Sequence, residues 1–429
     1  MEIYVVQQGD SIYTIAERFS IPADKLAYDN GLAYPYNLVI GQALVIAYPK
    51  QSHIVQEGDS LQSIAEAYSV SQMQILRNNS FISDRGYLVP GEALVISYNT
   101  SRSITVNGFT YPYIKGETLI KALPNLTYLT VFNYSITEEG EIIEYYDDTE
   151  VVNTAKEYSV IPILMVTTLS SQGQPNIEIA YDVLLNIEYQ NRSINQFTDI
   201  MKQKGYQGLN IVFNYLNKNN QSLYLDFAQR ISERLQQEGL LLFITINYST
   251  EENNNSISVE EIDYLTLSMY VKGLIFLKFV WGTNFGPPSP VSNINNIRAI
   301  INYTTSTAPA DKIIIGKPVL GYDWQLPYVP DRSYVASMSI DSAFELAYQT
   351  GAIIQLDEDS QTPYFYYNQI YFGAPVQHIV WFIDARSINA LINVLQEYSL
   401  NGSGIWNIMI YYPQLWTAIN SKFDTVKLI

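Results

Sequence analysis

One stretch of the chain has the residue types of a buried strand that opens into an active site. The apolar run 209–213 is entered through Gly208 and left through Asn214, just before a long helical pattern. Such a run is typical of a parallel strand in an α/β barrel, whose C-terminal end faces the active-site mouth. Asn210 and Asn214 can hydrogen-bond a substrate there, but an amide cannot deliver a proton at neutral pH.

The composition excludes several kinds of chemistry. There is no cysteine, and the two histidines, His53 and His378, are far apart in sequence, which leaves little for thiol catalysis, a metal site or a Ser-His-Asp triad. With 24 Lys+Arg against 42 Asp+Glu the net charge is −18, so nucleic acid and anionic membranes are not expected partners. We expect neither metal nor cofactor. A carbohydrate ligand would have to be held by stacking and hydrogen bonds.

The first hundred residues contain a repeat. Residues 6–17 return as 55–66, and residues 41–46 return as 91–96. Each copy predicts a short strand, two helices and a return strand, and a Gly-Asp-Ser turn offers a cap for the first helix. An Asn at the end of the second helix is interpreted as a left-handed cap.

This repeat resembles the LysM domain, whose pattern includes G-D-[ST]-L, I-A, an Asn and G-Q-x-L-x-I. We place the two units at 1–49 and 50–98. The resemblance implies binding of N-acetylglucosamine glycans such as peptidoglycan or chitin beside the Gly-Asp-Ser turn. The alternative is that the turn only caps a helix. The implied contacts are Gly9, Asp10, Ser11, Thr14, Gly58, Asp59, Ser60 and Ser63.

A polar linker at 99–103 separates these units from a large domain at 104–429. In this domain strand-like and helix-like stretches alternate, which predicts an α/β fold of the (β/α)₈ barrel type with a small α+β insertion at roughly 321–378. Helices are predicted at 183–201 and 223–238. Strands are predicted at 128–132, 160–166, 209–213, 241–246, 273–280, 313–319 and 404–409.

The large domain resembles the spore-cortex hydrolases of glycoside hydrolase family 18. Residues 207–214 have the frame of the family motif D-G-x-D-x-D-x-E, and residues 313–328, 357–366, 378–387 and 404–407 look like later motifs of these enzymes. In that family the last Glu is the general acid and the Asp two residues earlier orients the substrate's acetamide. The resemblance implies N-acetylglucosaminidases made in the mother cell of endospore-forming bacteria.

The acids of that family are missing from the frame. Asn214 stands at the position of the general acid, and Val212 stands at that of the orienting Asp. We therefore expect no catalytic residue. The positions interpreted as degenerate are Asn210, Val212, Asn214, Phe279, Val280 and Ile383. The carboxylates near the presumed mouth are interpreted as solvated loop charges or turn caps: Asp323, Asp357, Asp359 and Asp384.

Aromatic residues remain where the family surrounds its sugar. They offer stacking faces for pyranose rings, or they simply pack the barrel, and both interpretations stay open. Trp381 and Trp416 are expected to be core residues. The proposed cleft platform consists of Trp281, Tyr322, Trp324, Tyr328 and Trp406.

Three functional hypotheses follow. The first is a non-catalytic pseudoenzyme that binds peptidoglycan in the spore envelope as an anchor. The second is a residual or altered N-acetylglucosaminidase of the spore cortex, with Asn214 working beside a relocated acid. The third is a self-assembling spore layer or crystal protein. No signal peptide pattern is visible at the N-terminus, so we expect synthesis in the mother-cell cytosol and deposition on the spore coat or exosporium.

Overall fold

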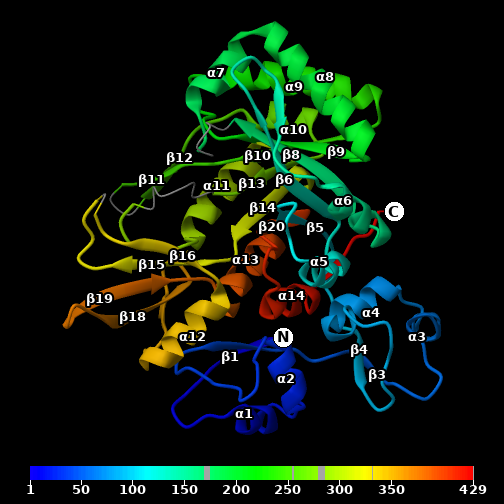
Figure 1. Cartoon of the computed structure of the whole chain (residues 1–429), viewed down its shortest axis with the longest axis vertical. Coiled ribbons are helices and arrows are strands. Elements are labelled where there is room, and N and C mark those ends of the chain that lie inside the picture. Colours follow the sequence, from blue (N-terminus) through cyan, green and yellow to red (C-terminus); the bar gives the residue numbers. More distant parts are fainter. Residues whose placement is uncertain (169–173, 254–255, 279–285, 331, 429) are drawn as a thin grey trace.

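A closed parallel barrel forms the centre of the molecule (Figure 1). The computed structural model describes residues 1–168, 174–253, 256–278, 286–330 and 332–428. Each barrel strand pairs in parallel with the next, and β5 and β6 close the ring. The predicted (β/α)₈ fold is therefore confirmed. The barrel strands are β5 (Arg102–Thr110), β6 (Tyr128–Ile136), β8 (Ile161–Thr168), β9 (Gly208–Phe213), β10 (Leu241–Ile246), β13 (Gly273–Phe276), β14 (Ile313–Pro318) and β20 (Gly402–Trp406).

Large apolar side chains fill the barrel interior. Phe109, Tyr128 and Phe243 pack there with Ile275 and other buried residues in one cluster. Alternate residues of each strand point inward, and the others contact the surrounding helices. One close approach requires glycine, because a Cβ at Gly316 would lie 2.6 Å from Leu277 Cβ. The interior is thus a packed core, and the open space lies above it at the strand ends.

Helices cover the outside of the barrel. The single helix predicted at 183–201 is instead two helices, because Asn186 ends the first and its side chain accepts a hydrogen bond from Glu188 N at 2.9 Å to cap the second. The outer helices are α5 (Gly116–Ala122), α6 (Thr149–Glu157), α7 (Ile177–Leu185), α8 (Ile187–Lys204), α9 (Gln221–Gln237), α10 (Tyr264–Tyr270), α11 (Ile294–Thr307), α13 (Ala385–Glu397) and α14 (Pro413–Asn420). No helix of the described residues is long and apolar enough to cross a membrane.

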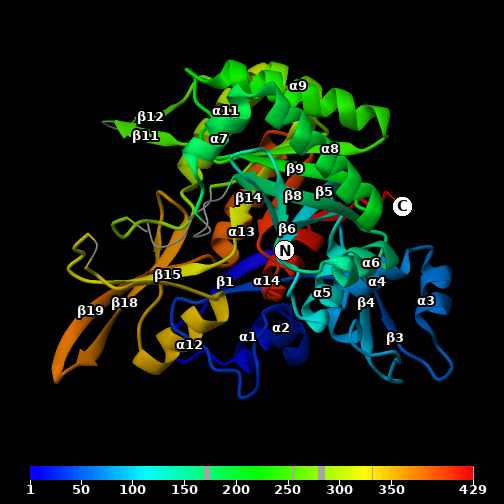
Figure 2. The same cartoon turned by 45° about the horizontal axis from the view of Figure 1, so that its top comes forward.

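An antiparallel sheet with one helix lies between β14 and α13. Its strand order is β16-β15-β19-β18-β17, and its strands run from Gly321 to Trp381. In Figure 2 its long β18–β19 hairpin projects away from the barrel. Its elements are β15 (Gly321–Gln325), β16 (Val335–Met338), α12 (Ile340–Thr350), β17 (Gln355–Asp357), β18 (Thr362–Tyr371) and β19 (Ala374–Trp381).

The two N-terminal units have the predicted strand–helix–helix–strand order. The Asn at the end of the second helix in each unit was expected to be a left-handed cap. Asn30 and Asn79 are not left-handed, because their φ angles are −108° and −141°. Each buried amide instead bonds the return strand, as Asn30 Nδ2 does to Val45 O at 2.9 Å. The first unit has β1 (Glu2–Val5), α1 (Ile12–Arg18), α2 (Ala23–Asp29) and β2 (Ala43–Ile46); the second has β3 (Gln51–Ile54), α3 (Leu61–Tyr68), α4 (Gln72–Asn78), the 3₁₀ turn η1 (Ser80–Ile82) and β4 (Ala93–Ser97).

Both units are docked on the barrel (Figures 1 and 2). Buried Gln414 of α14 donates to Asn30 Oδ1 at 3.0 Å and to Ala43 O at 2.8 Å in the first unit. Arg77 of the second unit forms an ion pair with Asp424 at 2.9 Å. The remaining short elements are η2 (Leu123–Asn125), β7 (Ile142–Glu144), β11 (Thr250–Asn253), β12 (Ser256–Val259), η3 (Ala310–Lys312) and β21 (Phe423–Thr425).

Candidate active-site cleft

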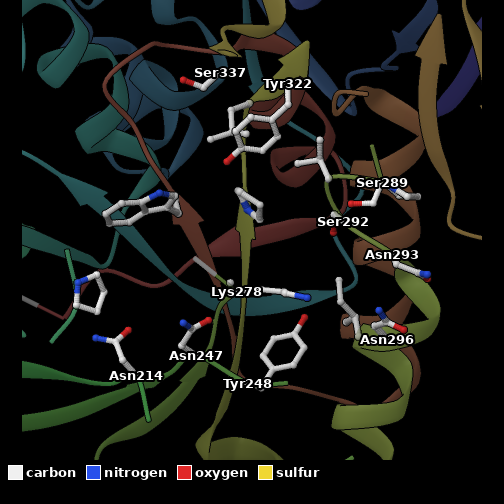
Figure 3. Close-up of a pocket in the computed structure, with 18 of the residues that line it drawn as sticks. Asn214, Asn247, Tyr248, Lys278, Ser289, Ser292, Asn293, Asn296, Tyr322 and Ser337 are labelled. Carbon is white, nitrogen blue, oxygen red and sulfur yellow. The ribbon is translucent and has the colours of Figure 1, made fainter. Parts of the chain in front are cut away.

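A cleft of about 600 Å³ lies at the C-terminal ends of the barrel strands (Figure 3). Asn214 follows β9, Asn247 and Tyr248 follow β10, and Lys278 follows β13. Trp406 closes the cleft from β20, and the insertion adds Tyr322 from β15. Parallel strands bring their C-terminal ends to one edge, so residues far apart in sequence meet here.

Strand β9 and the residue after it contain three of the positions interpreted as degenerate, and these three side chains are buried to different extents. Asn210 is fully buried, and its Oδ1 accepts a hydrogen bond from Thr245 at 2.9 Å. Val212, 6% exposed, packs in the apolar barrel interior. Asn214 reaches the cleft, where its Nδ2 donates to Thr167 Oγ1 at 2.8 Å and its Oδ1 has no hydrogen-bond partner among the described residues. Asn214 is thus the polar group that β9 presents to a ligand.

The described lining of the cleft contains no Asp or Glu. Lys278 is the charged side chain among these lining residues, and no ion pair to it occurs in the described part of the chain. Burial raises the pKa of the Tyr248 hydroxyl above its usual range, and it raises the pKa of Tyr322 to about 12. Both phenols therefore stay protonated at neutral pH and can donate hydrogen bonds to a sugar.

Only some residues of the predicted aromatic platform lie among the described residues that line the cleft. Trp406 and Tyr322 line the cleft; Trp324 also borders it, but it is only 2% exposed and its Nε1 donates to Gly286 O at 3.2 Å. Tyr328 is absent from the described lining and packs beside the Tyr322 and Trp324 cluster. Trp281 lies outside the described residues, as do Phe279 and Val280. Whether these rings bind sugar remains a prediction.

Three further expectations concern buried residues. Ile383 is fully buried in the main core and is not part of the described lining. Trp416 is buried as predicted, whereas Trp381 is partly exposed. The third expectation was that Asp323 and Asp384 are solvated loop charges or turn caps. It is wrong for Asp323, which is buried on β15, whereas Asp384 is buried but does act as a cap, because its side chain accepts from Arg386 N at the start of α13.

Hydrogen-bond partners explain the burial of these two carboxylates. Asp323 accepts hydrogen bonds from Tyr367 at 2.7 Å and His378 at 3.0 Å, and Asp384 pairs with Arg386 at 2.6 Å. Asp357 accepts from Ser360 N at 3.0 Å, and Asp359 is exposed. None of the four is among the residues that line the cleft.

In the Gly-Asp-Ser turns of the N-terminal units, the Asp and Ser side chains form hydrogen bonds to residues close in sequence. Ser11 caps α1 in a reciprocal bond with Thr14, and Ser60 and Ser63 repeat this at α3. Asp10 accepts from Tyr4 at 2.6 Å, and Asp59 bonds His53 at 2.8 Å. Gly9 and Gly58 have φ of +88° and +89°, a conformation that favours glycine. The helix-capping interpretation therefore holds, and glycan contact remains a prediction.

Sequence reasoning missed Asn247, Tyr248 and Lys278. The signal was available, because Asn247 and Tyr248 directly follow the strand predicted at 241–246. Lys278 was hidden inside a strand predicted to extend to residue 280, whereas β13 ends at Phe276. The rule that polar residues after barrel strands face the mouth finds all three once the strand ends are known.

Family models match both parts of the chain. Residues 95–409 match the model described as Glycosyl hydrolases family 18, and residues 4–47 and 53–97 match the LysM domain. The first match spans well over half of the chain. The chain therefore belongs to glycosyl hydrolase family 18 and has two LysM domains before its barrel.

Relatives match the chain from end to end. Two are named cortical fragment-lytic enzyme: that of Bacillus anthracis is 28% identical over 434 residues, and that of Bacillus subtilis (strain 168) is 29% identical over 435 residues. Each match covers 100% of this chain and 99% of the relative. The crystal structure of the spore cortex-lytic enzyme SleL from Bacillus megaterium QM B1551 has a TM-score of 0.79 at 30% identity, covering 100% of this chain and 99% of that one.

These relatives correct our first hypothesis. The expectation of a non-catalytic, anchoring pseudoenzyme is wrong, because proteins that match the whole chain are named for lysis of cortex fragments. The expectation rested on the absence of family residues at Val212 and Asn214 and at the four other positions interpreted as degenerate. Loss of a general acid typically slows a reaction by about 10²–10⁴-fold. In a substrate-assisted glycosidase the sugar's own acetamide remains as nucleophile.

Proposed function

We propose that this chain is an N-acetylglucosaminidase with altered chemistry that acts on the glycan of the spore cortex. The observation that carries the proposal is the match to cortex-lytic enzymes over the full length of both chains. A polar and aromatic cleft at the strand ends supports it, since this is where barrel enzymes bind their substrates.

The reaction would use the substrate's acetamide as the nucleophile. Its carbonyl oxygen attacks the anomeric carbon, the bond from that carbon to the glycosidic oxygen breaks, and the leaving oxygen takes up a proton. Asn214 would orient the sugar after a turn of its side chain that brings its Oδ1, which is buried and has no hydrogen-bond partner among the described residues, to the acetamide N–H. Water then opens the cyclic intermediate and returns a proton to the protein.

Lys278 is our candidate for the relocated acid. Its ammonium carries a transferable proton, and it is the charged group in a described lining without carboxylates. Lysine can serve as a general acid, but an ammonium is a weaker acid than a carboxylic acid. The expected rate is therefore low compared with that of an enzyme that has Glu at the position of Asn214.

Glycan binding by the LysM domains would hold the enzyme on its polymeric substrate. The contacts implied by the family are Gly9, Asp10, Ser11, Thr14 and their counterparts Gly58, Asp59, Ser60 and Ser63. Because the side chains of Asp10 and Ser11 are occupied by local hydrogen bonds, backbone groups of the turn would provide most of the polar contacts. The spore is the expected site of action, and the name of the similar spore cortex-lytic enzyme supports it.

The test is release of reducing ends from purified cortex fragments by the full-length protein. We expect slow release by the wild type, loss of at least tenfold in Lys278→Met, and the same loss in Lys278→Arg, because a guanidinium keeps the charge but does not give up its proton. Retained activity in Lys278→Arg would assign Lys278 a purely electrostatic role. No release by the wild type above a buffer blank after prolonged incubation would overturn the proposed function.

A further inference from the structure

A line of aromatic rings leads out of the cleft beside the C-terminal end of β5. We propose that Tyr111, Tyr113 and Tyr146 form a tyrosine track that binds the continuation of the glycan strand beyond the cleft. The inference rests on the proposed function for the identity of the strand. It adds a binding surface, because the three tyrosines are not among the described residues that line the cleft. Trp406, from which the track starts, is part of that lining.

The rings follow one another at contact distance. The ring centroids of Trp406 and Tyr111 are 6.0 Å apart, those of Tyr111 and Tyr113 are 5.3 Å apart, and those of Tyr113 and Tyr146 are 5.4 Å apart. All three spacings lie in the range of favourable aromatic pairs. The planes of Tyr111 and Tyr113 differ by only 19°, so these two rings are stacked. The track is thus continuous from the cleft to the outer rim.

Backbone position explains why the track opens at the mouth. Tyr111 and Tyr113 follow the C-terminal end of β5, which lies at the same edge of the barrel as the cleft. Tyr146 follows β7, which extends the hairpin that begins with β6. Two separate loops therefore place their tyrosines side by side at this edge.

Exposure increases along the track. Tyr111 is partly buried, whereas Tyr113 is 58% exposed and Tyr146 is 57% exposed. A row of half-exposed aromatic rings continuous with a binding cleft is typical of an interaction surface rather than of core packing. No hydrogen bond of the three phenol groups occurs among the described residues, so each hydroxyl is available to a ligand.

The chemistry of the track fits an uncharged pyranose. The apolar C–H face of a sugar ring stacks on an aromatic face, and a phenol hydroxyl at the ring edge can bond the sugar's hydroxyl or acetamide groups. An anionic partner is disfavoured, because Glu144 and Asp147 flank Tyr146 in sequence and the chain carries a net charge of −18. We therefore assign the track to N-acetylglucosamine units of the strand whose neighbouring units occupy the cleft.

Binding to the barrel can be measured separately from binding to the LysM domains. All five tryptophans lie beyond residue 280, so tryptophan fluorescence reports chiefly on the barrel domain, and Trp416→Phe removes the signal of the tryptophan on α14, the helix that contacts the first LysM domain. The full-length protein would be titrated with N-acetylglucosamine oligomers from the dimer to the hexamer. Mass spectrometry of each sample shows whether the oligomers remain intact.

We expect Tyr113→Ala and Tyr146→Ala each to weaken hexamer binding by about two- to tenfold and to leave dimer binding unchanged. Tyr113→Phe should keep most of the affinity because the ring remains. Tyr145→Ala is the matched control, since Tyr145 is 47% exposed in the same loop but bonds Ser135 at 2.7 Å instead of joining the track.

Equal hexamer affinity in Tyr113→Ala, Tyr146→Ala and Tyr145→Ala would overturn the track, and so would the absence of any fluorescence change with the wild type. The outcome is independent of catalysis. A length-dependent loss of binding in a protein that releases no reducing ends would support the track and contradict the proposed function.

Discussion

Asn214 stands at the mouth of the barrel with its amide nitrogen bonded to Thr167 and its carbonyl oxygen unpaired. The Asn214 side chain is partly exposed and borders the cleft, whereas the preceding strand β9 is buried. Val212, two residues earlier, is surrounded by Phe109, Phe243 and other apolar side chains. A carboxylate is therefore easier to accommodate at residue 214 than at residue 212.

Restoring an acid at the mouth should accelerate hydrolysis. We expect Asn214→Glu to raise the rate of reducing-end release from cortex fragments by about 10²-fold or more, because a carboxylic acid protonates the leaving oxygen better than an ammonium does. Asn214→Gln is the matched control, since it has the same length without the acid. Equal rates for the two variants would show that the scissile bond does not lie beside residue 214.

Lys317 is a residue-scale source of pH dependence. It is buried on β14, its Nζ donates to Ser387 O at 2.5 Å, and burial lowers its pKa to about 7 although Asp384 acts in the opposite direction. The unfolded chain has the ordinary lysine pKa of about 10.4. Between these values the unfolded state binds more protons than the folded state, so stability rises with pH.

We expect the melting temperature of the wild type to rise between pH 7 and pH 9, and to rise less in Lys317→Met. Lys427 contributes in the same direction, because burial also lowers its pKa to about 7. Lys317→Met should therefore flatten the profile in part, and Lys317→Met combined with Lys427→Met should flatten it further. Calorimetry at fixed ionic strength measures this. An unchanged slope in the double variant would contradict the assignment.

At the scale of elements, the capping boxes stabilise the first helix of each LysM domain. Ser11 Oγ accepts from Thr14 N at 3.2 Å, and Thr14 Oγ1 accepts from Ser11 N at 3.0 Å. The same pair of bonds is formed by Ser60 and Ser63 at 3.0 Å each. These bonds satisfy backbone N–H groups that the helix itself leaves free.

Replacing the cap separates its structural role from glycan binding. Ser11→Ala should cost about 1 kcal/mol of stability, whereas Ser11→Asn keeps a capping oxygen and should cost little. Urea unfolding measures the stability, and sedimentation with insoluble peptidoglycan measures binding. If Ser11 contacts glycan through its side chain, Ser11→Asn binds more weakly at unchanged stability. Equal binding would restrict the contact to the backbone of the turn.

At the scale of the whole molecule, the LysM domains and the barrel share buried hydrogen bonds. Gln414 is fully buried between α14 and the first LysM domain, where it also accepts from Tyr412 at 2.5 Å. Arg77 of the second domain donates to Asp424 and to Thr425 O. The domains are therefore fastened to the barrel and should unfold with it.

We expect a single calorimetric transition for the wild type. Gln414→Ala should lower the stability by about 1–3 kcal/mol, because the buried acceptors Ala43 O and Asn30 Oδ1 each lose a donor, and Asn30 Oδ1 keeps only Val45 N. It should also bring forward or separate the melting of the first LysM domain. Gln229→Ala is the control, since this glutamine is exposed on α9. Two resolved transitions in the wild type would contradict the docking.

The sequence by itself determined the repeat, the alternation of strands and helices, and the frame at 207–214, because these patterns depend on local periodicity and on neighbours in the chain. It also identified Asn214 as a polar residue at the end of a strand. Only the tertiary structure decided which distant residues join it. Asn247, Tyr248, Lys278 and Trp406 converge because eight parallel strands among the described residues end at one edge. Asp323 is buried because its partners Tyr367 and His378 come from other elements, which local patterns do not reveal.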